Sequence, residues 1–309
     1  MRILGGTGLE IAPLVLGGNV FGWTADRETS FAILDAFVAA GFNAIDTADV
    51  YNRYAPGLKG GESETIIGEW LHDRGNRDKV VLITKGGLPM GDEQEGLGRD
   101  YLQQACQASL RRLRTDHIDV YLAHAPDPAT PIAETLDTFG MLQAKGLVRH
   151  AGCSNYSVTE LQDALDAAGE GTARYAVVQP RYNLAERADY EGALEDLCVS
   201  EGLGVITYYA LAAGFLTGKY RSEADLAGKA RSRVASQFVN AAGLDLLARM
   251  DEVAARHDAT PAQVALAWVI ARPSVAAPIV SATSVVQLEE LLQAARITLR
   301  EEDFAVLDS

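Results

Sequence analysis

The chain has 309 residues, of which 48% are hydrophobic and 22% charged, a composition that supports a globular protein with a substantial buried core. Its 42 acidic and 27 basic residues give a formal net charge of −15, which disfavours binding to nucleic acid and to anionic membranes. No basic-then-apolar leader opens the sequence and no apolar run of about 18 residues occurs, so we expect a cytoplasmic protein. The three cysteines lie far apart in apolar stretches, which predicts free, buried thiols and argues against a disulfide framework or a zinc site.

Short β-rich runs alternate with helical patterns along the chain, as in βαβ units on a parallel sheet. The predicted strands are residues 11–16, 43–46, 80–84, 118–122, 148–153, 176–179, 204–208 and 277–280. The predicted helices are residues 30–40, 62–72, 100–113, 132–144, 158–167, 190–200, 244–256, one that begins at Thr260-Pro261, and residues 285–295. Eight such units without a linker favour an α/β fold, a (β/α)₈ TIM barrel in a single domain over residues 1–309, rather than an open doubly wound sheet.

A β-hairpin is predicted at the start of the chain, before the repeating pattern is established. Its two arms are residues 1–4 and 10–13, and the turn between them is Gly5-Gly6-Thr7-Gly8. We expect this hairpin to plug the bottom of the barrel.

Polar residues stand at the carboxyl ends of the predicted strands, where the active site of such a barrel lies. These residues are Asp46, Lys85, His124, Ser154, Asn155, Gln179, Tyr208 and Ser281, and Tyr51 lies just beyond the second strand. Taken singly, each has a simpler explanation: an aspartate after a strand often caps a turn, and a lone histidine is more often structural than catalytic. The set as a whole is more informative than any of its members.

Four of these residues together suit the reduction of a carbonyl group: Asp46, Tyr51, Lys85 and His124. A reductase gives a proton to oxygen as hydride reaches carbon, and a tyrosine with a pKa near 10 is a poor proton donor and acceptor near neutrality. We expect the Lys85 ammonium to lower the pKa of Tyr51, and Asp46 to hold the lysine. A histidine can orient the substrate oxygen and help to relay the proton. The hydride itself requires a cofactor.

Several segments, in this order and spacing, resemble the aldo-keto reductase family over almost the whole chain. They are residues 46–51 (DTADVY), 61–64 (GESE) with 67–68, 84–85, 119–127 (DVYLAHAPD), 152–156 (GCSNY), 178–179 with 182–184, and 214–220 (GFLTGKY). The resemblance implies a (β/α)₈ barrel that binds NADPH, less often NADH, without a Rossmann fold. It places a catalytic tetrad on Asp46, Tyr51, Lys85 and His124, with Tyr51 as the proton donor. The implied activity is NAD(P)H-dependent reduction of aldehydes or ketones to alcohols.

The same resemblance implies which residues hold the cofactor. Ser154, Asn155 and Gln179 match positions that hold the nicotinamide carboxamide, and Tyr208 matches the aromatic residue that stacks on its ring. The remaining matches are Gly18 and Asn19 beside the first strand, Leu211, Gly214, Leu216 and Lys219 over the pyrophosphate, and Ser281, Thr283, Gln287 and Glu290 at the adenosine end.

The cofactor-binding segments depart from the family pattern in two places. Tyr209 and Ala210, in the loop of residues 208–211, stand where serine and proline are usual, and Leu291 stands where the family has an asparagine beside the adenine. No arginine or lysine occupies residues 281–287, where many NADPH-specific members place a cation for the 2′-phosphate. Arg231 or Arg233 is the alternative source of that charge. We expect NADPH as the cofactor, with NADH as the alternative.

The loop of residues 52–60 is insertion-like, and Arg53, Tyr54 and Lys59 are candidates for the substrate mouth, although a solvated loop is the simpler interpretation. The other expected substrate contacts are Trp23, which packing explains equally well, residues 51–54 and 88–90, and the loop after Phe215. The expected partner is a small carbonyl compound, and neither a nucleic acid nor a membrane. The oligomeric state leaves no mark in the sequence.

Two other functions fit the same residues. One is a dehydrogenase of the same fold that oxidises an aldose or another sugar with NAD(P). The other is a non-enzymatic barrel that binds the nucleotide as a sensor or channel-associated subunit. Metal-dependent hydrolysis is disfavoured, because the remaining histidines do not line up with strand ends, and we expect no metal.

Overall fold

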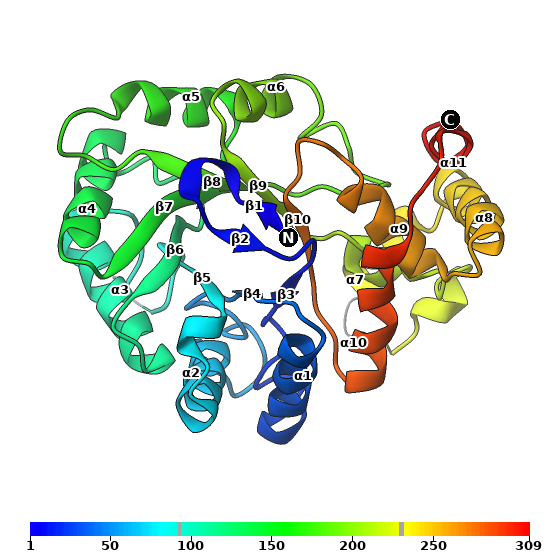
Figure 1. The fold of residues 1–309 in the computed structure, drawn as a ribbon, viewed down its shortest axis with the longest axis horizontal. Helices are drawn as coiled ribbons and strands as arrows, with labels where there is room; N and C mark the ends of the chain where they lie inside the picture. The colour runs from blue at the N-terminus through cyan, green and yellow to red at the C-terminus, as the bar shows by residue number, and fades with distance from the viewer. Residues whose placement is uncertain (92–93, 229–231) are drawn as a thin grey trace.

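Parallel strands form a closed barrel in the computed structural model, which describes residues 1–91, 94–228 and 232–309 (Figure 1). Their order around the barrel is β10-β3-β4-β5-β6-β7-β8-β9. The strands are β3 (Val15–Gly17), β4 (Ala44–Asp46), β5 (Val81–Gly86), β6 (Ile118–Ala123), β7 (Val148–Ser154), β8 (Tyr175–Gln179), β9 (Gly204–Thr207) and β10 (Ala277–Val280). The predicted (β/α)₈ barrel is therefore confirmed.

Helices surround the barrel (Figure 1). They are α1 (Arg27–Ala39), α2 (Glu62–Arg74), α3 (Arg99–Leu113), α4 (Ile132–Ala144), α5 (Val158–Ala167), α6 (Ala193–Ser200), α7 (Ser232–Ala235), α8 (Ala241–Arg256), α9 (Pro261–Ile270), α10 (Val285–Leu292) and α11 (Glu301–Leu307). Local sequence sets several helix starts, since Ser157 and Thr260 form capping boxes at α5 and α9. Within the described ranges, no helix combines the length and the apolar character needed to cross a membrane.

Three features differ from the predicted elements. The single strand predicted over residues 11–16 is divided into β2 (Glu10–Ile11) and β3, because Pro13 between them has no N–H to donate. The long connection before α8 contains the short 3₁₀ helices η3 (Ala212–Thr217), η4 (Glu223–Leu226) and η5 (Ser236–Phe238), which the sequence did not predict. Helix α11 was not predicted either.

The N-terminal hairpin closes one end of the barrel, as predicted. Strand β1 (Arg2–Ile3) pairs antiparallel with β2, and a short helix, η1 (Gly5–Thr7), lies between them. Leu4 and Ile11 are fully buried and belong to the apolar cluster inside the barrel. Gly5 approaches the first residue of β9, Gly204, so closely that a Cβ on Gly5 would overlap its backbone. Because the hairpin covers the amino ends of the strands, the opposite end is the one available for a site.

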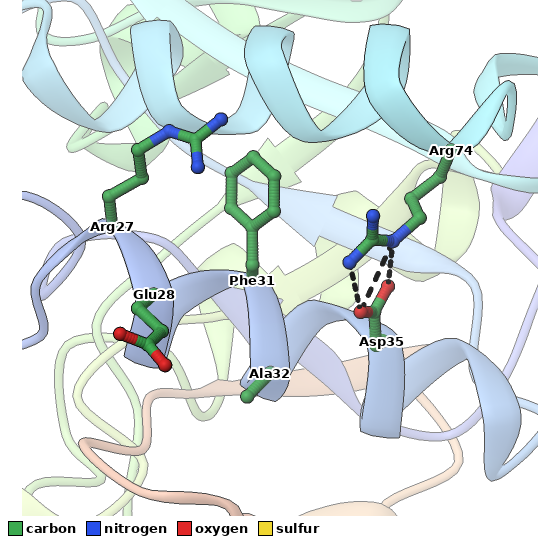
Figure 2. A pocket seen from close by; sticks show the side chains of 6 residues that line it. All are labelled: Arg27, Glu28, Phe31, Ala32, Asp35 and Arg74. Carbon is green, nitrogen blue, oxygen red and sulfur yellow. Dashed lines mark hydrogen bonds and ion pairs between the residues drawn. The ribbon is translucent and has the colours of Figure 1, made fainter.

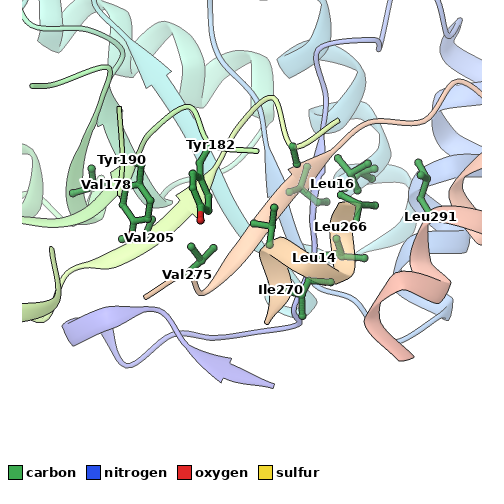
Figure 3. Packing of buried hydrophobic residues seen from close by; sticks show 14 of the residues in the cluster. Leu14, Leu16, Val178, Tyr182, Tyr190, Val205, Leu266, Ile270, Val275 and Leu291 are labelled. Atoms are coloured by element: carbon green, nitrogen blue, oxygen red, sulfur yellow. The ribbon is translucent and has the colours of Figure 1, made fainter. Parts of the chain in front are cut away.

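A larger apolar cluster fills the space between the strands and the helices, and Figure 3 shows part of it. Leu14, Leu266 and Leu291 all lie in this cluster and are at most 2% exposed. Burying a leucine side chain contributes roughly 1.5–3 kcal/mol, so this layer fixes the helices on the barrel. The cysteines are free and buried, as predicted.

A shallow hollow on the outer surface lies between α1 and α2 (Figure 2). The guanidinium of Arg27 lies 4.1 Å from the centroid of the Phe31 ring. Arg74 pairs with Asp35 at 2.8 Å. Because Arg27 also pairs with a carboxylate, that of Glu69 at 2.6 Å, both arginines are neutralised here. We therefore interpret the hollow as a contact between the two helices on the outer surface.

Candidate active site

Lys85 lies at the centre of a buried charge cluster at the carboxyl ends of β4 and β5. Its Nζ donates to both carboxylate oxygens of Asp46, at 2.7 and 2.8 Å, to the backbone oxygen of Thr47 at 2.8 Å and to the Tyr51 hydroxyl at 2.9 Å. The side chains of Lys85 and Asp46 are each 1% exposed. Gln179, the last residue of β8, donates from Nε2 to Asp46 Oδ1 at 2.8 Å. The buried ion pair therefore has the additional hydrogen bonds that such pairs require.

The turn after β4 places Tyr51 against this pair. Asn52 adopts a left-handed φ of 71°, and its Nδ2 donates to the backbone oxygen of Phe21 at 2.7 Å, which ties the turn to the loop between β3 and α1. The Tyr51 hydroxyl donates to Asp46 Oδ2 at 3.1 Å and accepts from Lys85. Both the proton and the oxygen of the phenol are thus held in place.

The structure corrects the predicted effect of Lys85 on Tyr51. Desolvation, followed by the Asp46 carboxylate, raises the pKa of Tyr51 well above its ordinary value. The prediction assigned Asp46 only to holding the lysine, whereas Asp46 also accepts a hydrogen bond from the phenol, and its negative charge disfavours the phenolate. Tyr51 therefore keeps its proton at neutral pH. The raised pKa also makes Tyr51 a weaker acid, so donation of that proton would depend on Lys85 stabilising the phenolate.

His124 follows β6 and meets the Tyr51 ring edge-on, with ring centroids 6.1 Å apart. Its Nδ1 is buried and has no hydrogen-bond partner within the described ranges. Desolvation, followed by the charge of Lys85, lowers the pKa of His124 to about 3. The ring is therefore neutral, and a neutral imidazole offers one N–H donor. In this state it can orient a substrate oxygen, and its part in a proton relay stays a prediction.

The residues predicted to hold the nicotinamide form a hydrogen-bonded set at the ends of β7, β8 and β9. Asn155 donates from Nδ2 to the backbone oxygen of His124 at 2.8 Å and to Ser154 Oγ at 3.2 Å. The Tyr208 hydroxyl donates to Asn155 Oδ1 at 2.6 Å. Ser154 Oγ donates to the backbone oxygen of Gln179 at 2.8 Å. The structure thus brings these predicted residues together and, through Gln179, joins them to the charge cluster.

The loop after β9 contains three consecutive residues with a left-handed backbone. Residues 212–214 adopt φ angles of 47°, 55° and 89°. The N–H groups of Ala212 and Gly214 donate to the backbone oxygens of Tyr209 and Leu211, at 2.7 and 2.8 Å. A Cβ on Gly214 would lie 3.1 Å from Lys219 Nζ, so the ammonium stands beside this glycine. Leu211 is half-buried and Leu216 is fully buried.

The residues predicted at the adenosine end lie in the loop between β10 and α10 and on α10, with Asn19 beside them. Ser281 Oγ donates to Asn19 Oδ1 at 2.7 Å, and the Thr283 N–H donates to Gln287 Oε1 at 2.8 Å. Glu290 accepts from the threonine hydroxyl at the N-cap of α9, at 3.1 Å. Glu290 therefore already has a structural partner within the protein.

Four further residues were named from the sequence in connection with cofactor binding. Gly18 donates its N–H to the backbone oxygen of Asp46 at 2.7 Å and lies beside β4. Leu291 is 2% exposed within the apolar cluster, so the departure from asparagine leaves no polar group at that position. The Arg233 side chain is exposed, and Arg231 lies outside the described residues.

Comparison with known proteins agrees with this geometry. The model of the aldo/keto reductase family matches residues 13–309. The chain belongs to the aldo/keto reductase family. It is 31% identical to protein tas of Escherichia coli (strain K12), over 97% of this chain and 94% of that protein. It is 34% identical to the uncharacterized oxidoreductase YrpG of Bacillus subtilis (strain 168), over 99% and 94%. It is 31% identical to norsolorinic acid reductase stcV of Emericella nidulans, over 96% and 77%.

The loop of residues 52–60 in this aldo/keto reductase is largely open to solvent. Tyr54 is 78% exposed, and Arg53 donates to the backbone oxygen of Pro89. Trp23 is 42% exposed, so packing alone does not account for it. A Cβ on Gly60 would lie 2.9 Å from the Met90 methyl group, which places this loop against residues 88–90. Two of the segments predicted to contact substrate, the loop of residues 52–60 and residues 88–90, are therefore neighbours.

One buried residue of this aldo/keto reductase was not singled out from the sequence. Asp49 lies between Asp46 and Tyr51 in the chain, is 1% exposed, and has no hydrogen-bond partner for either carboxyl oxygen within the described ranges. An acidic residue inside a buried segment was the only signal available. Among residues 1–91, 94–228 and 232–309, no group of three or more His, Cys, Asp or Glu side chains is arranged to hold a metal ion.

Proposed function

We propose that this chain reduces a small aldehyde or ketone to the alcohol with NADPH, or alternatively NADH, and that Tyr51 donates the proton. The observation that carries the proposal is that the Lys85 ammonium contacts both the Asp46 carboxylate and the Tyr51 hydroxyl. Lys85 Nζ lies 2.7 Å from Asp46 Oδ1 and 2.9 Å from the Tyr51 hydroxyl. The family membership supports oxidoreduction, and this contact supports acid catalysis at a carbonyl oxygen.

The residues present fit a nicotinamide cofactor, which supplies the hydride when bound. Ser154, Asn155 and Gln179 would hold the carboxamide, and the Tyr208 ring would stack on the nicotinamide. The loop that contains Leu211, Gly214 and Leu216 would pass over the pyrophosphate, with Lys219 adding positive charge. Glycine at position 214 suits this role, since a Cβ would crowd the ammonium at 3.1 Å.

The proton-transfer step follows from the charge cluster. His124, which is neutral because its pKa is lowered to about 3, would donate an N–H to the carbonyl oxygen. As Tyr51 releases its proton to that oxygen, negative charge forms on the phenol. Lys85 stabilises this charge from 2.9 Å in a site from which water is largely excluded.

Replacing Tyr51 tests the proposed donor. We expect Tyr51→Phe to lose turnover by on the order of 10²–10⁴-fold, which is typical for removal of a general acid, while cofactor binding followed by fluorescence is unchanged. Tyr190→Phe is the matched control and should keep the wild-type rate, because it removes only a hydroxyl that donates to the backbone oxygen of Ser274 outside the proposed site. Turnover of Tyr51→Phe near the wild-type rate would refute the role of Tyr51.

A panel of substrates separates the competing activities. Aldehydes and ketones with NADPH and NADH, and aldoses with NADP and NAD, are assayed by absorbance of the reduced nicotinamide. Faster aldose oxidation than carbonyl reduction would identify a sugar dehydrogenase. Tight cofactor binding without turnover of any compound would favour the non-enzymatic alternative. Clearly tighter binding of NADH in a fluorescence titration would overturn the preference for NADPH.

A further inference from the structure

Asp49 is a buried acid directly behind the catalytic lysine. Its backbone N–H donates to the Lys85 carbonyl oxygen at 3.2 Å, which fixes it beside β5. Its side chain is 1% exposed, and within the described ranges neither carboxyl oxygen has a hydrogen-bond partner. An ionised carboxylate without partners is very costly in such a place.

The nearby cations are already engaged by other carboxylates. Lys85 pairs with Asp46 at 2.7 Å. Arg112 Nε pairs with the fully buried carboxylate of Glu64 at 2.7 Å. The second oxygen of Glu64 accepts from the Thr84 hydroxyl at 2.6 Å. Of the three acids in this region, Asp49 is therefore the one that has no cation of its own.

The surroundings of Asp49 also favour its neutral form. The titratable and charged groups that face it are Lys85 on β5, Glu64 on α2, Arg112 and Tyr101 on α3, and Tyr121 on β6. Desolvation, followed by the charge of Glu64, raises the pKa of Asp49 to about 8, although Arg112, the backbone N–H of Val50 and Lys85 oppose this.

Glycine at position 86 leaves room for polar groups at this point. A Cβ there would overlap the Tyr121 hydroxyl and would lie 3.5 Å from Asp49 Oδ2. The Tyr121 hydroxyl is itself buried and without a hydrogen-bond partner within the described ranges. Asp49 and Tyr121 thus face the same small space beside the residue that follows Lys85.

We propose that Asp49 is a positioning residue for the reduction. As a neutral acid it does not compete with Asp46 and Tyr51 for the Lys85 ammonium, and its ionisation in alkaline solution opposes proton transfer from Tyr51. This proposal rests on the proposed function. Reduction places a negative charge on the Tyr51 oxygen, and Lys85 compensates it. A second carboxylate beside Lys85 weakens that compensation, so hydride transfer, which is coupled to the proton, slows as Asp49 loses its proton to solvent.

The protonation state of Asp49 is tested without any cofactor, by infrared spectroscopy of the purified protein. A buried neutral acid has a carboxylic C=O band distinct from the bands of carboxylates. We expect this band at neutral pH, its loss in alkaline solution, and its absence in Asp49→Asn. Asp163→Asn, which removes an exposed acid on α5, is the matched control and should retain the band. Absence of the band in the wild type, or its persistence in Asp49→Asn, would overturn the proposal.

The role in the reaction is tested by single-turnover oxidation of the reduced cofactor as a function of pH. We expect the wild-type rate to fall by about tenfold as Asp49 ionises, with a midpoint near the raised pKa of about 8. Asp49→Asn should lack this fall, Asp49→Glu should restore it, and KM should stay constant because Asp49 contacts neither substrate nor cofactor. A fall that persists in Asp49→Asn would refute the role. Absence of carbonyl turnover in the wild type would instead refute the proposed function, and the infrared band would still report on Asp49.

Discussion

Removing the Lys85 ammonium should destabilise the protein by an amount that follows from its contacts. In Lys85→Met, the Asp46 carboxylate stays 1% exposed without its counter-ion. Breaking a buried pair in this way costs about 3–5 kcal/mol. Asp46 keeps two neutral donors, Gln179 Nε2 at 2.8 Å and the Tyr51 hydroxyl at 3.1 Å, and each contributes about 1 kcal/mol. We therefore expect a loss near the lower end, about 3 kcal/mol.

Removing both charges should be less harmful than removing either one. Asp46→Asn leaves a buried ammonium without its partner, whereas the double variant Asp46→Asn/Lys85→Met leaves no unpaired charge. The double-mutant cycle should then give a coupling free energy of about 2 kcal/mol or more, since the two groups are in direct contact.

Urea unfolding of the cofactor-free protein, followed by circular dichroism at neutral pH, measures these differences. Lys145→Met, which removes an exposed lysine next to α4, is the control and should change the free energy of unfolding by less than about 0.5 kcal/mol. A loss below about 1 kcal/mol in Lys85→Met would refute the reasoning. The same is true of a double variant whose loss equals the sum of the two single losses.

Two further predictions concern the same region. A Cβ on Gly18 would lie 2.7 Å from Ser63 Oγ and 3.2 Å from the Asp46 carbonyl oxygen, so Gly18→Ala should lose about 1–3 kcal/mol. Gly6→Ala, whose Cβ would have no neighbour nearer than 3.9 Å, should keep the wild-type melting temperature, and equal melting temperatures for both variants would contradict this. Because the pKa of His124 falls from 6.5 to about 3 on folding, its contribution to stability is lost as the pH falls through that range. In nuclear magnetic resonance the His124 ring should show no titration near 6.5, and a midpoint there would disprove its neutral state.

The barrel and the central charge cluster were predictable because parallel strands in a barrel all end at the same mouth. Asp46, Lys85 and Gln179 needed only to be recognised as strand-end residues to be placed together. The direction of the Tyr51 pKa was not predictable, since it depends on which charges lie close to the phenol. The role of Asp49 was not predictable either, because only the contacts in the structure show that Lys85 pairs with Asp46 and not with Asp49. The roles of the cofactor-binding residues stay predictions.

The elements that were not predicted from the sequence are stabilised by contacts that produce no periodic pattern in it. The 3₁₀ helices η3, η4 and η5 are too short to show an apolar period. Helix α11 has seven residues, and it is held by Asp303, which contacts His257 at 2.7 Å and Arg256 at 3.1 Å. These contacts cross more than forty residues of sequence, so they depend on the complete fold.

Backbone strain concentrates at the same mouth as the charges. Among the described residues, the non-glycine residues with left-handed φ in the loops after β4, β7 and β9 are Asn52, Asn155, Tyr209, Ala212 and Ala213. The others, Arg114 and Asp258, follow α3 and α8, where such a conformation is an ordinary helix ending. For alanine or tyrosine this conformation costs roughly 1–2 kcal/mol per residue, and it persists only where the surrounding structure enforces it. The closed barrel, plugged at its other end by the hairpin, provides that enforcement, so loops that would relax in isolation stay fixed around Lys85 and Tyr51.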